Sequence, residues 1–344
     1  MKAAYMLDGD IQVGEVADPV PEQGQALVRT CCCALCASDA HFLAHTREAI
    51  DLSRKYGGLY ADIDLERKMV PGHEFVGEVV DYGPKSLRPL RPGTKVTSAP
   101  LVRTAVGRAV IGHSHDYPGG FGEFMLLDET RLMAVPDGLP DEMAAMTEPL
   151  STGLEHARVG APKREDVCLV VGCGAIGLGV IAGLKLMGMG PIVAADFDPA
   201  RLAVAIRMGA DVIVDPREQN PYEPLHGLGK RRATLIYECV GHPGMLGEIM
   251  RSVGFDARIV VGGFCMEAEE IYIPSGQMKR LSIQFASGAD QQDLDLALRS
   301  IADGSVDVQA WLGSGIGLGD VGDTLRAMAD PGSSIRTVVD PGRM

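Results

Sequence analysis

Three short segments of the sequence carry residue types that bind metal ions. They are Cys36-Ala37-Ser38-Asp39-Ala40-His41, Pro71-Gly72-His73-Glu74-Phe75 and Thr147-Glu148-Pro149-Leu150. Thiolates, imidazoles and carboxylates are the protein ligands of zinc. Each segment alone is consistent with a buried thiol, a hydrogen-bonded loop histidine or a helix-capping carboxylate. Their occurrence together, ahead of a glycine-rich turn, is far more specific for a metal-dependent enzyme.

The glycine-rich turn is Gly172-Cys173-Gly174-Ala175-Ile176-Gly177, and it fits the pattern Gly-x-Gly-x-x-Gly. It follows the apolar run Val167–Val171 and opens a predicted helix, which is the context of a dinucleotide-binding turn. Gly172 would make the tight turn, Gly174 would let the backbone approach a pyrophosphate, and Gly177 would let helix and strand pack closely. The helix N-terminus, starting at Ala175 and Ile176, would supply free N–H groups and a positive field.

An acidic residue follows this turn at the spacing that a dinucleotide site requires. Asp196 lies 19 residues after Gly177, at the end of the apolar run Ile192–Ala195. Its carboxylate would accept hydrogen bonds from the adenosine ribose and repel a 2′-phosphate, which favours NAD over NADP. Arg201 is placed to flank the adenine of either cofactor. The alternative is a tight turn followed by a solvated aspartate.

The combined motifs resemble the zinc-dependent medium-chain dehydrogenases, of the alcohol and polyol (sorbitol-like) branch, over nearly the whole chain. Cys36 to His41 is similar to the family's Gly-x-Cys-Gly-(Ser/Thr)-Asp-x-His segment, with Ala37 in place of a glycine. The family segments Gly-His-Glu and Glu-Pro-Leu are matched by Gly72-His73-Glu74 and Glu148-Pro149-Leu150. Further similarity lies in Gly119–Phe124 and Glu238–Gly241.

This resemblance implies a role for each site residue. Cys36 and His73 would be zinc ligands, with Glu74 or Glu148 as the third protein ligand and an open position for the substrate. Asp39 would orient one of the zinc ligands without binding the zinc itself. Ser38 would take the proton of the bound alcohol and pass it through the cofactor ribose to His41; otherwise His41 is a plain surface histidine. Arg336 aligns with a basic residue that faces the cofactor pyrophosphate, the alternative being an exposed strand arginine.

Two departures from the family pattern change what is expected. The stretch Val96–Tyr117 contains no cysteine, so the four-cysteine structural zinc of some relatives should be missing. We therefore expect one zinc per chain. The interval from His41 to His73 is longer than usual, with the extra residues inside Thr46–Met69, where the family lines its substrate cleft. The substrate is thus not predicted; cleft candidates are Leu43, Tyr56, Tyr60, Phe264 and Trp311.

The pattern of elements predicts a mixed α/β fold with two domains. The first ~130 residues read as strands and turns, such as Ala26–Cys31 and Phe75–Val80, with a helical or loop excursion between Ala40 and Lys68. From Val167 strands alternate with helices, which predicts a doubly wound parallel sheet. We expect a GroES-like β-rich catalytic domain formed by 1–150 and 286–344, and a Rossmann dinucleotide-binding domain formed by 151–285.

Composition narrows the function classes and the location. The 344 residues carry a formal net charge of −14, which disfavours nucleic-acid binding and an anionic membrane surface. Glycines and a lysine interrupt the longest apolar stretch, and the N-terminus lacks a signal-peptide core, so a cytoplasmic enzyme is expected. Four of the eight cysteines crowd into residues 31–36, which favours a reduced compartment over disulfides.

The sequence therefore predicts a zinc- and NAD-dependent dehydrogenase of a small alcohol, polyol or matching carbonyl compound. The resemblance also implies a homodimer or homotetramer, with strands near Ile259–Ile283 extending the Rossmann sheet across a two-fold axis. Two alternatives stay open: a zinc-free quinone or enone reductase of the same superfamily, and a non-catalytic dinucleotide-binding protein. Both would lack a bound zinc.

Overall fold

The computed structural model describes residues 1–344 except 105–106, 224–227, 229–232, 329–334 and 344. Residue contacts divide the chain into two compact units. Unit 1 is Met1–Glu148 with Leu298–Met344, and unit 2 is Pro149–Ala297. Residues 286–297, which the sequence placed in the first domain, thus group with unit 2. Arg158 explains this, since its guanidinium donates to the Asp293 carboxylate at 3.1 and 2.8 Å and to Asp290 at 3.2 Å.

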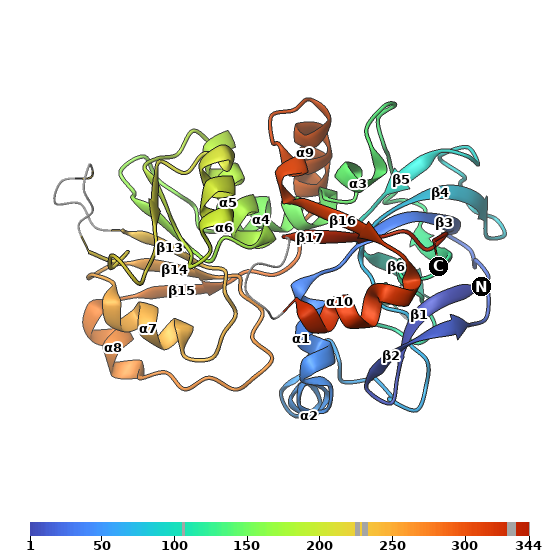
Figure 1. Ribbon diagram of the computed structural model, residues 1–344, viewed down its shortest axis with the longest axis horizontal. Coiled ribbons are helices and arrows are strands. Elements are labelled where there is room, and N and C mark those ends of the chain that lie inside the picture. Colours follow the sequence, from blue (N-terminus) through green and yellow to red (C-terminus); the bar gives the residue numbers. More distant parts are fainter. Residues whose placement is uncertain (105–106, 224–227, 229–232, 329–334, 344) are drawn as a thin grey trace. The chain divides into compact units, whose positions relative to one another are not determined.

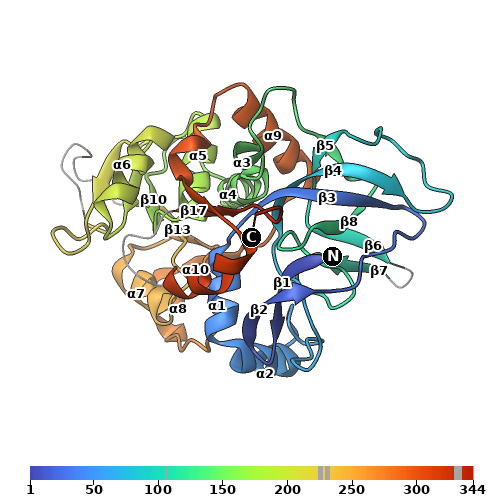
Figure 2. The same ribbon diagram turned by 45° about the vertical axis from the view of Figure 1, so that its right-hand side comes forward.

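Unit 1 is built mainly from antiparallel strands. Within the described residues, one sheet has the order β16-β17-β3-β4-β5-β9, with β8 also paired to β3, and two hairpins, β1–β2 and β6–β7, stand beside it. Figure 2 shows the long strands β3 and β4 running together across this unit. The bounds are β1 Lys2–Leu7, β2 Asp10–Glu15, β3 Gln25–Ala34, β4 Glu74–Tyr82, β5 Lys95–Thr97, β6 Leu101–Thr104, β7 Gly107–Val110, β8 Phe124–Asp128, β9 Met133–Ala134, β16 Leu312–Ile316 and β17 Arg336–Val339.

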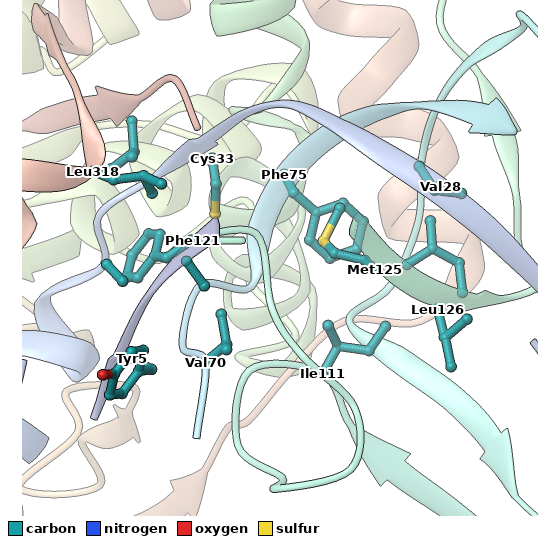
Figure 3. Close-up of a cluster of buried hydrophobic side chains, with 14 of the residues drawn as sticks. Tyr5, Val28, Cys33, Val70, Phe75, Ile111, Phe121, Met125, Leu126 and Leu318 are labelled. Carbon is teal, nitrogen blue, oxygen red and sulfur yellow. The ribbon is translucent and has the colours of Figure 1, made fainter. Parts of the chain in front are cut away.

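A hydrophobic core fixes the ends of β3 and β4. Phe75 from β4, Met125 from β8 and Phe121 from the loop before β8 are fully buried, and Cys33 from β3 lies among them (Figure 3). Burying a side chain of this size contributes roughly 1.5–3 kcal/mol. The residues just beyond Ala34 and just before Phe75 are therefore held on a rigid support.

Two helices form between β3 and β4, where the sequence analysis expected a helical or loop excursion. The segment after β3 forms α1 (Ala37–Ala44) and α2 (Thr46–Tyr56), as expected, and then runs without regular structure to β4. The other helical segments assigned wholly to unit 1 are α3 (Asp141–Ala144), η1 (Val308–Trp311), η2 (Leu318–Asp320) and α10 (Val321–Ala327). Helices α4 (Thr147–Val159) and α9 (Gln291–Ala302) each begin in one unit and end in the other.

Unit 2 is a doubly wound α/β domain, which confirms the predicted fold class. Its parallel strands have the order β12-β11-β10-β13-β14-β15 among the described residues, so the order reverses beside β10. Figure 1 shows α5 and α6 on one face of this sheet and α7 and α8 on the other. The bounds are β10 Cys168–Val171, α5 Ala175–Leu186, β11 Ile192–Ala195, α6 Pro199–Met208, β12 Val212–Val214, β13 Leu235–Glu238, α7 Met245–Ser252, β14 Arg258–Val261, α8 Ile273–Lys279 and β15 Ser282–Phe285.

Local sequence explains the strands and helices of unit 2. All four residues of β10 and of β11 are buried, as the continuous apolar runs predict for strands covered on both faces. Helix α6 starts at the N-cap Asp198, whose carboxylate accepts the Ala200 N–H, and has Pro199 in its first turn. It ends at Gly209, which has a left-handed φ of 114°. In the described part of the chain, helices fall short of the length and apolar character that a bilayer span needs.

Candidate functional site

The structure brings three of the predicted metal ligands together in unit 1. The ligand atoms of Cys36, His73 and Glu74 all lie within 4.8 Å of one another. Cys36 is the N-cap residue of α1, directly after β3, and Glu74 is the first residue of β4. Strands β3 and β4 pair antiparallel with Ala34 opposite Glu74, so the end of one strand meets the start of the other. The sheet register therefore places the thiol, the imidazole and the carboxylate at one point.

Asp39 lies behind two of these residues. Its Oδ2 accepts the backbone N–H of Cys36 at 3.4 Å, and its Oδ1 is 3.6 Å from Nδ1 of His73. Burial raises the pKa of Asp39, but His73 overrides this and leaves it below the usual value. Burial lowers the pKa of His73, but Asp39 and Cys36 together hold it well above the usual value. A carboxylate in this position orients a ligating imidazole through the nitrogen that faces away from the metal.

Arg336 lies in this cluster. Its Nε and Nη2 donate to the two oxygens of Glu74 at 2.8 Å each, and its Nη2 is 3.9 Å from Sγ of Cys36. Its Nη1 donates to the Ile335 carbonyl at 3.1 Å. The pyrophosphate contact predicted for Arg336 stays a prediction, whereas the alternative, an exposed strand arginine, is wrong because the side chain is buried. Arg336 reaches Glu74 because β17 pairs with β3, which puts the start of β17 beside the end of β3.

The charges of the cluster fit a divalent cation. Asp39, Glu74 and Arg336 are buried, and burial of unbalanced charge is costly. With Cys36 ionised and His73 neutral, as metal ligands must be, the three anions Asp39, Glu74 and Cys36 and the one cation Arg336 leave two negative charges. A dication would neutralise them. The donor set of sulfur, nitrogen and oxygen also matches zinc.

The remaining predicted residues of unit 1 lie around this cluster. Ser38 Oγ donates to Sγ of Cys36 at 3.2 Å. His41 is half-buried one turn further along α1. Glu148 lies in the first turn of α4 and is not in the group formed by Cys36, His73 and Glu74, although its charge acts on Arg336. The structure thus brings Glu74 closer to Cys36 and His73 than it brings Glu148.

The glycine-rich turn of unit 2 has the geometry that its spacing predicts. Gly172 has a φ of +91°, which favours glycine, and a Cβ on Gly177 would lie 1.9 Å from the Gly172 carbonyl oxygen. A Cβ on Gly174, the N-cap of α5, would meet no atom within 4 Å. The first and third glycines are thus required by the protein itself. The second faces open space at a helix N-terminus, where a phosphate group binds well.

The Asp196 carboxylate is hydrogen-bonded to the glycine-rich turn. Its Oδ2 accepts the Cys173 N–H at 2.7 Å and its Oδ1 accepts the Asp198 N–H at 2.8 Å. Both contacts orient the carboxylate at the C-terminal end of β11. Arg201 lies in the first turn of α6, with Nε 3.7 Å from Asp198 Oδ2. Ala175 and Ile176 begin α5, so the predicted cofactor residues other than Arg336 gather at the ends of β10 and β11.

The sequence analysis missed His113. It is half-buried next to the predicted ligands, with its ring centroid 5.2 Å from that of His73, and it forms a second group of possible ligands with Asp39 and His73. Its position in a cysteine-free loop gave no signal beyond the presence of a histidine. Among the cleft candidates, Tyr60 lies beside His113 with ring centroids 5.6 Å apart. Tyr56 is 71% exposed at the end of α2.

Comparison with known proteins agrees with this geometry. Residues 22–137 match the family model described as alcohol dehydrogenase GroES-like domain, and residues 175–303 match the one described as zinc-binding dehydrogenase. L-Threonine 3-dehydrogenase of Sinorhizobium medicae is 26% identical over 324 residues, which is 90% of each chain. (R,R)-Butanediol dehydrogenase of Bacillus subtilis is 28% identical over 298 residues, covering 79% of this chain and 80% of that one.

The fold is shared with solved structures of the same kind. The crystal structure of 2R,3R-butanediol dehydrogenase from Bacillus subtilis superposes with a TM-score of 0.79 and 25% identity, over 99% of both chains. Both family models together span most of the chain. The first contains Cys36, His73 and Glu74, and the second begins at Ala175, inside the glycine-rich turn. The chain belongs to the zinc-dependent medium-chain dehydrogenase family and is an oxidoreductase.

Proposed function

We propose that this protein transfers a hydride between an alcohol or polyol, or the matching carbonyl compound, and NAD, with one catalytic zinc per chain. The observation that carries the proposal is the group of Cys36, His73 and Glu74, with the buried Asp39 beside His73. The curated relatives, which act on butanediol, sorbitol and threonine, support an alcohol or polyol as the substrate class. The sequence features support a cytoplasmic location.

Cys36 and His73 would hold the metal, with Glu74 or Glu148 as the third ligand. When bound, zinc supplies Lewis acidity toward the alcohol oxygen, which makes deprotonation possible near neutral pH. Glu74 lies nearer to Cys36 and His73 than Glu148 does, but each oxygen of Glu74 already accepts a hydrogen bond from Arg336. Glu148 is not in the group formed by Cys36, His73 and Glu74, and its charge also acts on Arg336. Asp39 holds His73 in the tautomer whose other nitrogen faces Cys36.

Ser38 and His41 would remove the alcohol proton. Ser38 Oγ lies within hydrogen-bond distance of the predicted ligand Cys36, so an oxygen held beside Cys36 comes within reach of Ser38. Ser38 and His41 are three residues apart on α1 and share a face of the helix. The ribose hydroxyl of the cofactor would connect them, and His41 would release the proton to solvent.

The cofactor preference gives a direct prediction for Asp196. NAD should exceed NADP by more than about tenfold in kcat/KM, because the carboxylate repels a 2′-phosphate and such a like-charge contact costs more than ~1.4 kcal/mol. Asp196→Asn removes the charge, keeps an oxygen for the two backbone N–H groups, and should narrow the preference by about tenfold. Initial rates with both cofactors measure it.

Asp198→Asn is the matched control, because Asp198 lies two residues away and asparagine also caps helices well. Its cofactor preference should stay within about twofold of the parent. Equal kcat/KM for NAD and NADP in the parent protein would refute the role of Asp196.

The edge of the unit 2 sheet supports a homodimer or homotetramer. Strand β15 is the last strand in the sheet order and has an open edge within the described residues. Its Phe285 is 73% exposed, and Tyr272, Ile273 and Met278 at α8 are also exposed. Exposed apolar groups beside a free strand edge indicate an interaction surface. Light scattering should give two or four times 36.5 kDa, and Phe285→Lys should lower the mass toward one chain.

Leu87→Lys is the control for this substitution, since Leu87 is an equally exposed apolar residue in unit 1. It should leave the mass unchanged. A parent mass of 36.5 kDa would exclude the proposed assembly.

One experiment separates the proposed function from its alternatives. Purified protein is analysed for metals, and NADH formation is followed with a panel of alcohols and polyols. We expect one zinc per chain and turnover that a chelator removes. A zinc-free quinone or enone reductase would hold no zinc and reduce its substrates without it, while a non-catalytic dinucleotide-binding protein would bind NADH without turnover.

A further inference from the structure

Buried polar atoms without partners gather beside the metal-binding cluster. Among the described residues, five buried side-chain nitrogen or oxygen atoms have no hydrogen-bond partner, and three of them are Oη of Tyr60, Nδ1 of His73 and Nδ1 of His113. The His73 atom faces Asp39, at a distance slightly longer than a hydrogen bond. The Tyr60 hydroxyl has no hydrogen-bond partner among the described residues, and His113 belongs with Asp39 and His73 to the second group of possible metal ligands. Leaving buried polar groups unpaired is unfavourable, so two neighbouring ones indicate an occupant that bonds to both.

The Tyr60 ring contacts the rings of Phe42 and His113. The Tyr60 ring stacks on Phe42 with centroids 4.0 Å apart and an interplanar angle of 9°. Burial raises the pKa of Tyr60, and the negative charges of Asp39 and Cys36 raise it further, so its hydroxyl lies within their electrostatic reach. The hydroxyl stays protonated and can donate a hydrogen bond. Because Tyr60 is only 2% exposed, water from bulk solvent does not satisfy it.

His113 is the second polar group of this pair. Its ring lies beside those of Tyr60 and His73, at centroid distances of 5.6 and 5.2 Å. The ligand atoms of His113, His73 and Asp39 all lie within 4.8 Å of one another. A neutral imidazole offers one N–H donor and one acceptor lone pair. Together, Tyr60 and His113 can bind one hydroxyl group, which also both donates and accepts.

The segment that carries Tyr60 is held firmly in place. Arg54 donates to the carbonyls of Ala61 and Ile63 at 3.1 and 3.0 Å, on the two sides of Asp62. His115, two residues after His113, accepts the Asp64 N–H at 2.9 Å. Residues 61–64 are therefore bonded both to α2, through Arg54, and to the loop that carries His113, through His115. Tyr60 is thus held on a preorganised support of the kind that a binding site needs.

We infer that Tyr60 and His113 bind a second oxygen of the substrate, next to the alcohol oxygen that reacts at the metal-binding cluster. The substrate class is then a vicinal diol or polyol, because the ring of His113 lies 5.2 Å from that of the predicted ligand His73, so the second oxygen would be held close to the first. This inference rests on the proposed function and narrows it. Tyr60 and His113 act as specificity-determining residues.

The test compares substrates that differ by one hydroxyl group. The probes are 2,3-butanediol with 2-butanol, and 1,2-propanediol with 1-propanol, and the readout is the ratio of kcat/KM within each pair. The parent should prefer the diols. Tyr60→Phe and His113→Leu should each reduce kcat/KM for the diols by about tenfold, as expected for one hydrogen bond lost, and change it by less than about twofold for the mono-alcohols. His113→Asn places a polar atom near the Nδ1 position and should restore part of the diol preference.

Tyr82→Phe is the matched control, because Tyr82 belongs to the same unit and bonds to Leu90, not to the cluster. Circular dichroism confirms that each variant is folded. Equal losses for diols and mono-alcohols, or a parent without diol preference, would overturn the inference and leave the proposed function standing. A zinc-loaded parent that oxidises neither kind of alcohol would overturn both.

Discussion

Cys36→Ser should lower kcat/KM for any alcohol by at least about 10²–10³-fold, while the protein remains folded. Cys36 is the sulfur donor of the cluster, and a serine hydroxyl is not ionised near pH 7. Lewis-acid assistance is worth several kcal/mol, and about 1.4 kcal/mol corresponds to each tenfold in rate. The fold should survive because a site with an open position contributes less to folding than a closed structural site. NADH formation, zinc analysis and circular dichroism measure the three effects.

Cys31→Ser is the matched control, since Cys31 lies on β3 five residues earlier and belongs to neither group of possible ligands. It should keep its zinc and its activity. Full turnover in a metal-free Cys36→Ser protein would disprove the proposed mechanism, and so would two zincs per chain in the parent.

The same assay decides between the two candidate carboxylates. Glu74→Gln and Glu148→Gln are compared for zinc affinity. Removing a direct ligand should lower the zinc affinity by more than the ~10–100-fold that is typical of a residue that only orients a ligand. The structure favours neither outcome alone, because Glu74 is nearer to Cys36 and His73 but is already paired with Arg336.

Arg336→Met should destabilise unit 1 by about 3–5 kcal/mol, the range for breaking a buried ion pair. The substitution leaves the buried carboxylate of Glu74 without the two donors that hold it in the parent. Urea unfolding is followed by the fluorescence of Trp311, the single tryptophan, which is buried in unit 1 and therefore reports on that unit.

A surface pair and a double substitution serve as controls. Arg326→Met removes an exposed arginine that pairs with Asp10 and Asp323 in the same unit, and it should cost less than about 1 kcal/mol. Adding Glu74→Gln to Arg336→Met should recover part of the loss, because the unpaired charge is removed. If Arg336→Met were no more destabilising than Arg326→Met, the pair would not support the site in the way described.

Features that depend on neighbouring residues were predicted from the sequence. The apolar run Ile192–Ala195 is β11. The Gly172–Gly177 turn likewise follows from the steric needs of its own backbone. The motifs that carry Cys36, His73 and Glu74 indicated a metal site because their residue types are recognisable one by one.

The tertiary structure decided what connects these motifs. Arg336 and Glu74 are 262 residues apart, and only the pairing of β17 with β3 brings them together. The sequence analysis proposed a cofactor contact for Arg336 and did not foresee its pairing with Glu74. His113 was missed for the same reason, since a single histidine in a loop has no pattern. Burial and contacts across the chain, which no local signal encodes, place it beside Tyr60 and His73 and give it a chemical role.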